Sequence, residues 1–188
     1  MAERSENVIM ADVWEHHKNM PENNLDVQQL IRNMKTGLDR YLQEHNRNNP
    51  LFVGIHTGGV WVAQQLHTLY RSSQPLGKLN IAFYRDDFSR IGLHPRVTPS
   101  NLPFDVVDRH VILIDDVLYT GRTVRAAMNE LFDYGRAASI CLAVLVDRSG
   151  RELPIQADVA GKRLVLEANQ QVKLSGPKPM ALEITTAA

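Results

Sequence analysis

One stretch decides the fold: Val111-Ile112-Leu113-Ile114-Asp115-Asp116-Val117-Leu118-Tyr119-Thr120-Gly121-Arg122-Thr123. Its first four residues are apolar and typical of a buried strand, and they lead directly into two adjacent carboxylates. A polar turn with one glycine then opens a segment that predicts a helix from Thr123 to about Tyr134, ending at Gly135. A buried strand, a polar turn and a helix in this order indicate one unit of an α/β sheet.

The segments on either side repeat this alternation. Apolar or alternating runs predict strands at residues 51–55, 79–84 and 140–146. Apolar residues at helical spacing predict helices over residues 26–44 and 60–70. At the start of the first helix, Asp26 and Gln29 have the spacing of a capping box. We therefore expect an open, mostly parallel, twisted sheet with helices on both faces.

The remaining regions lack a strong periodic pattern. Residues 1–24 are polar and are interpreted as an N-terminal extension, followed by one domain over residues 25–188. Residues 85–108 contain several charges and three prolines, and loops of this length in compact domains are usually functional or mobile. Residues 147–188 contain only short strand-like pieces, so we expect a small C-terminal subdomain there.

Composition excludes several classes of protein. With 188 residues the chain is long enough for about one domain, and 21 Lys and Arg balance 21 Asp and Glu. A neutral chain has no overall field that attracts nucleic acid or membranes. A single cysteine, Cys141, excludes an internal disulfide framework and a cysteine-cluster metal site. The longest apolar run, residues 140–146, is far shorter than a membrane span, so we expect a cytoplasmic protein.

The acidic and hydroxylated turn has the chemistry of a sugar-phosphate site. In open α/β sheets, ligands bind beyond the carboxyl ends of the strands, where this turn is expected. Gly121 lets the backbone approach a ligand, and the N–H groups that begin the next helix attract anions. Asp115 and Asp116 can accept hydrogen bonds from vicinal hydroxyls or help to hold hydrated Mg²⁺. Either half of the motif alone is equally typical of a solvated turn before a helix.

Residues 111–123 resemble the signature of type I phosphoribosyltransferases, which use phosphoribosyl pyrophosphate (PRPP). Within that family, residues 115–126 are similar to the pyrimidine-operon attenuation regulators, which also have uracil phosphoribosyltransferase activity. Residues 53–59 resemble the pyrophosphate loop of this group, and residues 83–89 resemble the start of its mobile loop. The resemblance spans about residues 26–162, and it implies the type I fold with a small C-terminal hood over residues 147–188.

The resemblance also implies roles for individual residues. Asp115 and Asp116 would bind the ribose hydroxyls and, through water, Mg²⁺, with Arg85 of the mobile loop as the third catalytic residue. The base would lie near Val146, Asp147 and Arg148. PRPP and its phosphates would contact Thr57, Gly58, Gly59, Val117, Leu118, Tyr119, Thr120, Gly121, Arg122 and Thr123.

The implied reaction is displacement of pyrophosphate from PRPP by uracil to give UMP. Purine-using relatives commonly have an acid at the position of Tyr119, so tyrosine there favours a pyrimidine. Similarity to the regulators also implies at least a homodimer. We expect Cys141, within an apolar run, to be a buried and inert thiol.

Two departures from the family pattern leave alternatives open. Gly58 stands where family members often have arginine, which removes a charge-assisted contact to pyrophosphate. Gly150-Arg151 stands where the attenuators have His-Arg, which weakens the expectation of RNA binding. The main alternative to the enzyme is a UMP- or UTP-sensing RNA-binding regulator with weak or no catalysis. A third is a fold that binds nucleotide without turnover.

Overall fold

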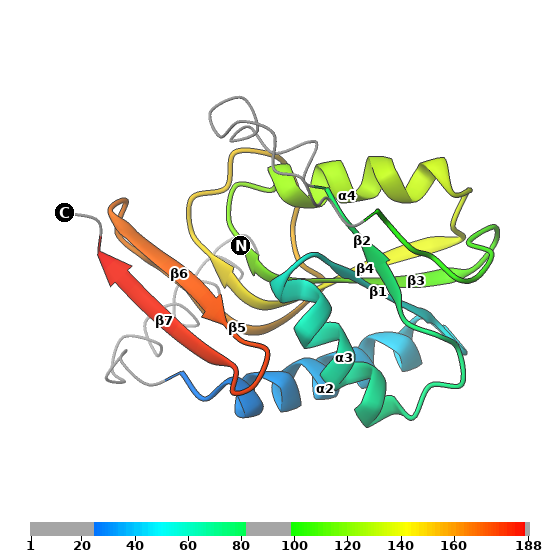
Figure 1. The fold of residues 1–188 in the computed structure, drawn as a ribbon, viewed down its shortest axis with the longest axis horizontal. Helices are drawn as coiled ribbons and strands as arrows, with labels where there is room; N and C mark the ends of the chain where they lie inside the picture. The colour runs from blue at the N-terminus through cyan, green and yellow to red at the C-terminus, as the bar shows by residue number, and fades with distance from the viewer. Residues whose placement is uncertain (1–24, 82–98, 187–188) are drawn as a thin grey trace, which may run out of the picture.

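The computed structural model describes residues 25–81 and 99–186 (Figure 1). Its elements are α2 (Val27–Glu44), β1 (Leu51–Ile55), α3 (Gly58–Tyr70), β2 (Gly77–Leu79), β3 (His110–Leu118), α4 (Arg122–Asp133), β4 (Ser139–Arg148), β5 (Val159–Leu164), β6 (Gln170–Ser175) and β7 (Ala181–Thr186). Within these ranges, no helix combines the length and apolar character needed to cross a membrane.

Five strands form one parallel sheet in the order β2-β1-β3-β4-β5. Val53 of β1 lies opposite Leu113 of β3, which in turn lies opposite Leu142 of β4. β1 and β3 are neighbours although β2 lies between them in the sequence, so the strand order reverses at this point. In open α/β sheets, the crevice beyond the carboxyl ends of the strands at such a reversal is where ligands bind.

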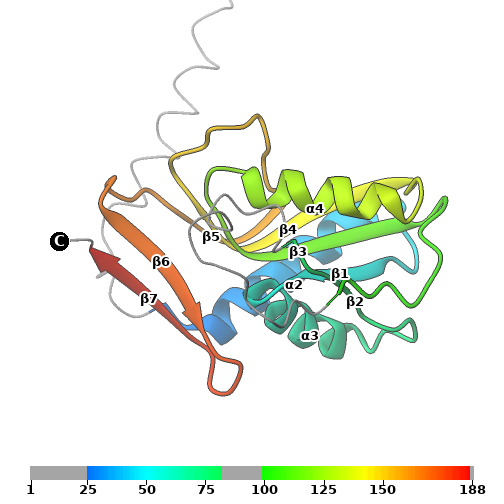
Figure 2. The same cartoon turned by 45° about the horizontal axis from the view of Figure 1, so that its top comes forward.

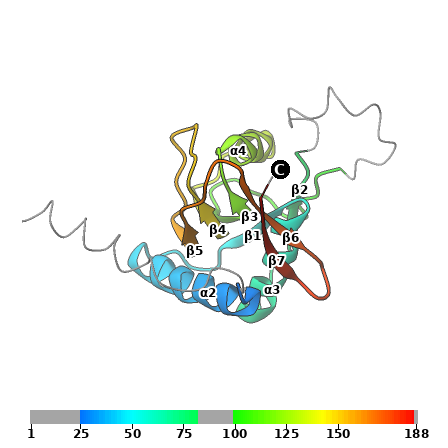
Figure 3. The same cartoon turned by 90° about the vertical axis from the view of Figure 1, so that its left-hand side faces the viewer.

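Helices cover both faces of the sheet, with α4 on one face and α2 and α3 on the other (Figure 3). Successive side chains of a strand point to opposite faces. Ile112 and Ile114 of β3 accordingly pack into the core under α2 and α3, whereas Val111 and Leu113 pack into the core under α4. Strands buried on both faces need continuous apolar runs, as the sequence has here. The predicted fold class is confirmed.

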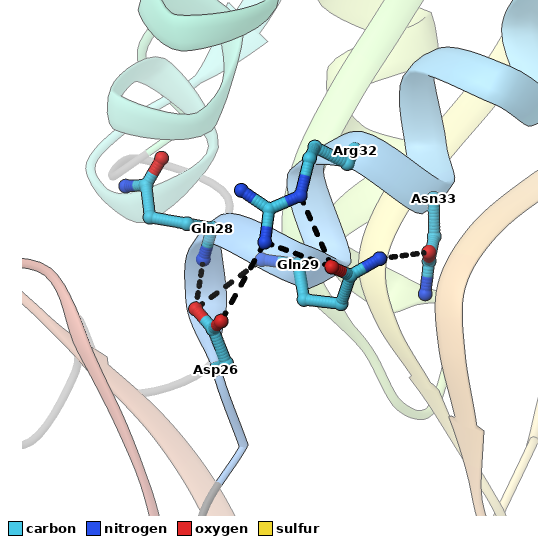
Figure 4. A network of polar contacts seen from close by, with 5 residues as sticks. All are labelled: Asp26, Gln28, Gln29, Arg32 and Asn33. Atoms are coloured by element: carbon cyan, nitrogen blue, oxygen red, sulfur yellow. Dashed lines mark hydrogen bonds and ion pairs between the residues drawn. The ribbon is translucent and has the colours of Figure 1, made fainter.

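Asp26 caps α2, as predicted (Figure 4). Its Oδ1 accepts hydrogen bonds from the backbone N–H groups of Gln28 and Gln29, at 2.9 and 3.2 Å. The Gln29 side chain does not complete the predicted capping box with Asp26; it bonds Arg32 and Asn33 further along the helix. One half of the predicted box therefore fixes the start of the helix.

Two strand boundaries differ from the prediction. β3 continues to Leu118, so Asp115 and Asp116 lie within the strand rather than in a turn after it. The ladder continues because β4 is long enough to pair Asp115 with Val144. β2 covers only Gly77–Leu79 instead of residues 79–84, because its partner β1 ends at Ile55, opposite Leu79. Of the predicted strand, residues 82–84 lie outside the described ranges.

The C-terminal region contributes to two sheets. β5 pairs with β4 as the edge strand of the main sheet, although residues 147–188 were all predicted to form a small hood. Only β6 and β7 form a separate antiparallel sheet, with Val172 opposite Ile184, and it stands beside the main sheet (Figures 1 and 2). Leu174 of β6 is buried in the core under α2 and α3, which attaches this hairpin to the domain.

Candidate active site

Two predicted site segments meet where β1 and β3 end side by side. A Cβ atom on Gly58 would lie 2.2 Å from Oδ2 of Asp116. A Cβ atom on Gly59 would lie 2.6 Å from the backbone oxygen of Ile114 and 3.2 Å from Oδ1 of Asp115. Without side chains, the backbone of residues 58–59 rests directly on the carboxylate pair. The predicted pyrophosphate loop and the predicted ribose-binding carboxylates therefore lie in contact with each other.

Asp115 and Asp116 differ in exposure. Asp115 has 4% of its surface exposed, and its Oδ1 accepts a hydrogen bond from the backbone N–H of Asp116 at 3.0 Å. Asp116 is half-buried, and its carboxylate faces Gly58. Both lie within β3, so ladder pairing with β4 holds their backbone. Asp116 is consequently the more accessible of the two carboxylates to a ligand.

The turn between β3 and α4 has the geometry of an anion site. Gly121 has a φ of 93°, in the left-handed region that glycine adopts readily. The Arg122 N–H donates to Oγ1 of Thr120 at 3.3 Å, and the Arg125 N–H donates to the Gly121 oxygen at 2.9 Å. The N-cap residue, Gly121, has no side chain that could cap α4. The first N–H groups of a helix favour an anion.

The other residues predicted to bind phosphate fall into two groups. Leu118 is buried in the core under α4, and Val117 packs against the opposite core. Their side chains serve packing, so they can contribute only backbone groups to a ligand site. Tyr119 is 41% exposed, Arg122 is exposed and Thr123 is half-buried, so these three side chains lie at the surface of the turn.

The loop after β1 carries little positive charge of its own. Thr57 is exposed, and Gly58 has no room for the arginine of the family pattern because the Asp116 carboxylate occupies that space. Burial, and then the nearby charge of Lys78, lowers the pKa of His56 below its ordinary value. Its ring is therefore neutral at neutral pH. A pyrophosphate group bound here would depend on backbone N–H groups and on charges outside residues 56–59.

The residues predicted to contact the base are placed differently from one another. Val146 is fully buried in the apolar core. Arg148 is also buried, at 6% exposure, and its guanidinium lies 3.9 Å from the centre of the Tyr119 ring. Its Nη1 donates a hydrogen bond to the backbone oxygen of Gln170 at 2.8 Å. The structure therefore brings Arg148 next to the turn between β3 and α4 and gives Val146 a packing role.

Asp147 forms ion pairs with two arginines that were not among the predicted site residues. Its carboxylate pairs with Arg151, and its Oδ2 lies 3.6 Å from Nε of Arg163. Arg151 also donates a hydrogen bond to the backbone oxygen of Tyr119, and Glu152 pairs with Arg122 at 2.9 Å. Charged residues that follow a strand usually face solvent, so the sequence offered no reason to assign Arg151 and Glu152 to the site. Their contacts with Tyr119 and Arg122 become visible only in the structure.

The carboxylate pair fits a hydrated Mg²⁺ ion. No group of three or more His, Cys, Asp or Glu residues gathers into a metal site within residues 25–81 and 99–186. The protein thus offers Asp115 and Asp116, beside a loop that presents backbone instead of side chains. Mg²⁺ typically keeps several waters and binds one or two carboxylates together with substrate phosphates. This donor set matches that preference.

Two predicted residues, Cys141 and Arg85, are not among those that form the carboxylate site and its turn as the structure describes them. Cys141 is buried, and burial, with a further contribution from Asp158, raises the pKa of its thiol to about 12. A thiol in this state is a poor nucleophile, in agreement with the predicted inert role. Arg85, predicted as catalytic, lies outside the described residues, as does the start of its loop.

Comparison with known proteins identifies the class of protein that has this fold and site. The chain matches the family model described as phosphoribosyl transferase domain over residues 24–175. Its fold is similar to that of a hypoxanthine phosphoribosyltransferase from Staphylococcus aureus, with a TM-score of 0.57 and 20% identity. That similarity covers 79% of this chain and 81% of the other. The class is that of the phosphoribosyltransferases.

Curated relatives narrow the class. A protein named bifunctional protein PyrR from Nitrosococcus oceani is 62% identical over 162 residues, covering 85% of this chain and 92% of the relative. A protein of the same name from Pseudomonas syringae pv. tomato is 55% identical over 156 residues, covering 83% and 92%. The chain belongs to the PyrR family of phosphoribosyltransferases. The resemblance seen in residues 111–123 is confirmed.

Proposed function

We propose that the protein is a uracil phosphoribosyltransferase that transfers the phosphoribosyl group of PRPP to uracil, giving UMP and pyrophosphate. The observation that carries this proposal is the contact of Gly58 and Gly59 with Asp116 and Asp115. That contact joins a loop suited to pyrophosphate to a carboxylate pair suited to ribose, and β3 leads from this pair into a turn suited to a 5′-phosphate. All three lie where the strand order of the sheet reverses.

Each part of the site has one task in the reaction. The bond from ribose C1 to pyrophosphate breaks and pyrophosphate leaves, while a bond from C1 to a ring nitrogen of uracil forms and the proton of that nitrogen passes to water. The turn at residues 119–123 holds the 5′-phosphate through backbone N–H groups, and the carboxylate pair orients the ribose through its hydroxyls. The backbone of residues 57–59 faces the departing pyrophosphate. Asp115 and Asp116 would hold a Mg²⁺ ion, which would supply positive charge to offset the negative charge that accumulates on pyrophosphate.

Tyr119 supports a pyrimidine substrate. Its ring packs on the Arg148 guanidinium and on Gly150, where an added Cβ would lie 2.4 Å from Cε2 of the ring. An acid at this position, as in purine-using relatives, would be drawn to Arg148 and would have no ring to stack. The aromatic contact therefore fits the pyrimidine-type pattern, with uracil proposed to lie near Asp147 and Arg148.

A direct assay tests the proposal. Wild-type protein incubated with PRPP, Mg²⁺ and radiolabelled uracil is expected to form labelled UMP in proportion to protein concentration. Hypoxanthine in place of uracil, under the same conditions, is the matched control and is expected to give no nucleotide. Absence of UMP at high protein concentration, or faster reaction with hypoxanthine, would overturn the assignment.

A second function, regulation through RNA, is favoured by a charged groove of about 430 Å³ between α2 and β5. The cations Arg40 and Lys162 line it, with Asp158 as its acid. Arg163 also belongs to the lining but pairs with Asp147, so it is not assigned to RNA. Lysine and arginine side chains that neutralise phosphates provide most of the non-specific affinity for nucleic acid. We propose that this groove, whose lining does not include the carboxylate pair, contacts RNA while the active site senses UMP or UTP.

Removing the groove cations separates the two functions. The double variant Arg40→Ala/Lys162→Ala is expected to weaken binding of leader RNA from pyrimidine-biosynthesis genes. The slope of log affinity against log salt should fall by about 1 for each cation that contacts a phosphate. UMP formation should stay at the wild-type rate. Lys173→Ala/Lys178→Ala, on the β6–β7 hairpin, is the control, and equal losses in both double variants would contradict a specific role for the groove.

Three further expectations from the sequence stay predictions. They are a homodimer or larger homo-oligomer, a cytoplasmic location, and the division into an extension over residues 1–24 and a domain over residues 25–188. Arg85 likewise remains a proposed catalytic residue of the loop over the site.

A further inference from the structure

The segment just after β4 holds the backbone of residues 119–123, the turn proposed to bind the 5′-phosphate, which we call the phosphate turn. The N–H groups of Glu152 and Leu153 both donate to the Thr120 oxygen, at 3.1 and 3.0 Å. The Arg151 guanidinium donates to the Tyr119 oxygen through Nη1 and to the Asp147 carboxylate through Nη2. Two successive backbone oxygens of the turn are thus held by three successive residues. We call residues 148–153 the brace.

These bonds fix the direction of the backbone N–H groups in the turn. In a trans peptide unit the C=O and N–H bonds are coplanar and point in opposite directions. The Tyr119 oxygen shares its peptide unit with the Thr120 N–H, and the Thr120 oxygen shares its unit with the Gly121 N–H. Because the brace holds both oxygens, both N–H groups are turned away from it. Donors held in place before a ligand arrives need little reorganisation when it binds.

Side chains add a second layer to the brace. Arg148 stacks over the centre of the Tyr119 ring, and Gly150, with a φ of 103°, lies against the ring at Cε2. Any side chain at position 150 would overlap the ring, since its Cβ would lie 2.4 Å from Cε2. Beyond the turn, Nε of Arg122 pairs with Glu152 at 2.9 Å. The turn is therefore held at its backbone, at its aromatic ring and at the start of α4.

We propose that Arg151 is a positioning residue that orients the phosphate turn for the 5′-phosphate of PRPP and UMP. This inference rests on the proposed function. Arg151 acts through the Tyr119 backbone oxygen and is anchored by Asp147, which lies in the segment proposed to bind the base. The guanidinium fork is suited to two acceptors at once, so one residue joins the base-binding segment to the phosphate-binding turn.

Substitution of Arg151 tests this role. Arg151→Met keeps a chain of similar reach but no donors, and it is expected to raise the Kd for UMP and the KM for PRPP by about 10- to 100-fold, the range for hydrogen bonds to charged groups. The KM for uracil, measured at saturating PRPP, should change by less than about threefold. Arg151→Gln, which keeps a polar group, should show the same split if Arg151→Met does not fold.

Arg163 supplies the matched control. It also lies near Asp147, with Nε 3.6 Å from Oδ2, but the turn is not among its contacts in the described structure. Arg163→Met should bind UMP within about twofold of the wild type. If folded Arg151→Met or Arg151→Gln binds UMP as the wild type does, or if Arg163→Met loses as much, the brace has no positioning role. A wild type that binds no UMP would instead overturn the proposed function.

Discussion

Replacing Asp116 by asparagine is expected to lower kcat/KM for UMP formation by about 100- to 1,000-fold, the usual cost of removing one electrostatic group from an active site. The substitution keeps the shape of the side chain, so its contact with Gly58 and the pairing of β3 are retained. It removes the negative charge that is proposed to orient the ribose hydroxyls and to hold Mg²⁺. Steady-state kinetics with PRPP, uracil and varied Mg²⁺ measure the effect, and the Mg²⁺ concentration needed for half-maximal rate should rise.

The control for this substitution lies near the opposite end of the same strand. Asp105 precedes β3 and accepts a hydrogen bond from the Val107 N–H at 2.9 Å, which an asparagine oxygen can also accept. Asp105→Asn is therefore expected to keep the wild-type rate. Wild-type turnover in Asp116→Asn would show that the carboxylate has another role, whereas equal losses in both variants would indicate a general loss of structure.

Patterns within short segments predicted most of the fold. The apolar runs of β1, β3 and β4 are buried on both faces of the sheet, and a run of that kind is recognisable without knowing its partners. The start of α2 was predictable from a nearby side chain, because the Asp26 carboxylate accepts hydrogen bonds from two backbone N–H groups. The juxtaposition of Gly58 and Asp116 also follows from the order of parallel strands, once their carboxyl ends share an edge.

Contacts between distant segments were harder to predict. The sequence of β5, which contains Gly161 and Lys162, predicts a strand only weakly. The segment joins the main sheet because β4 has an open edge to pair with. The brace depends on Arg151 reaching Tyr119, residues 32 apart whose proximity no local pattern encodes. Val146 was expected near the base because the family resemblance places the base at residues 146–148, yet its position in the strand turns its side chain into the core.

Gly58→Ala is expected to lower kcat/KM by about 100-fold, which is the scale for a misplacement of reacting groups by about 1 Å. The added Cβ would lie 2.2 Å from Oδ2 and 2.5 Å from Cγ of Asp116, so either the carboxylate or the loop must move. Both are proposed to hold parts of PRPP, and the KM for PRPP should therefore rise while the KM for uracil changes little. The same contact explains why an arginine at this position cannot be accommodated with Asp116 as it lies here.

Gly37→Ala separates this effect from a loss of stability. A Cβ on Gly37 would lie 2.7 Å from Cγ1 of Val159, where α2 packs on β5, so this variant meets a similar overlap away from the carboxylates. It is expected to change Tm but to leave kcat/KM of the folded protein near the wild-type value. Gly58→Ala should show the reverse: a smaller change in Tm than Gly37→Ala and a larger loss of kcat/KM. If Gly58→Ala turns over at the wild-type rate, the loop has room to move away from Asp116, and the close contact is not what positions PRPP.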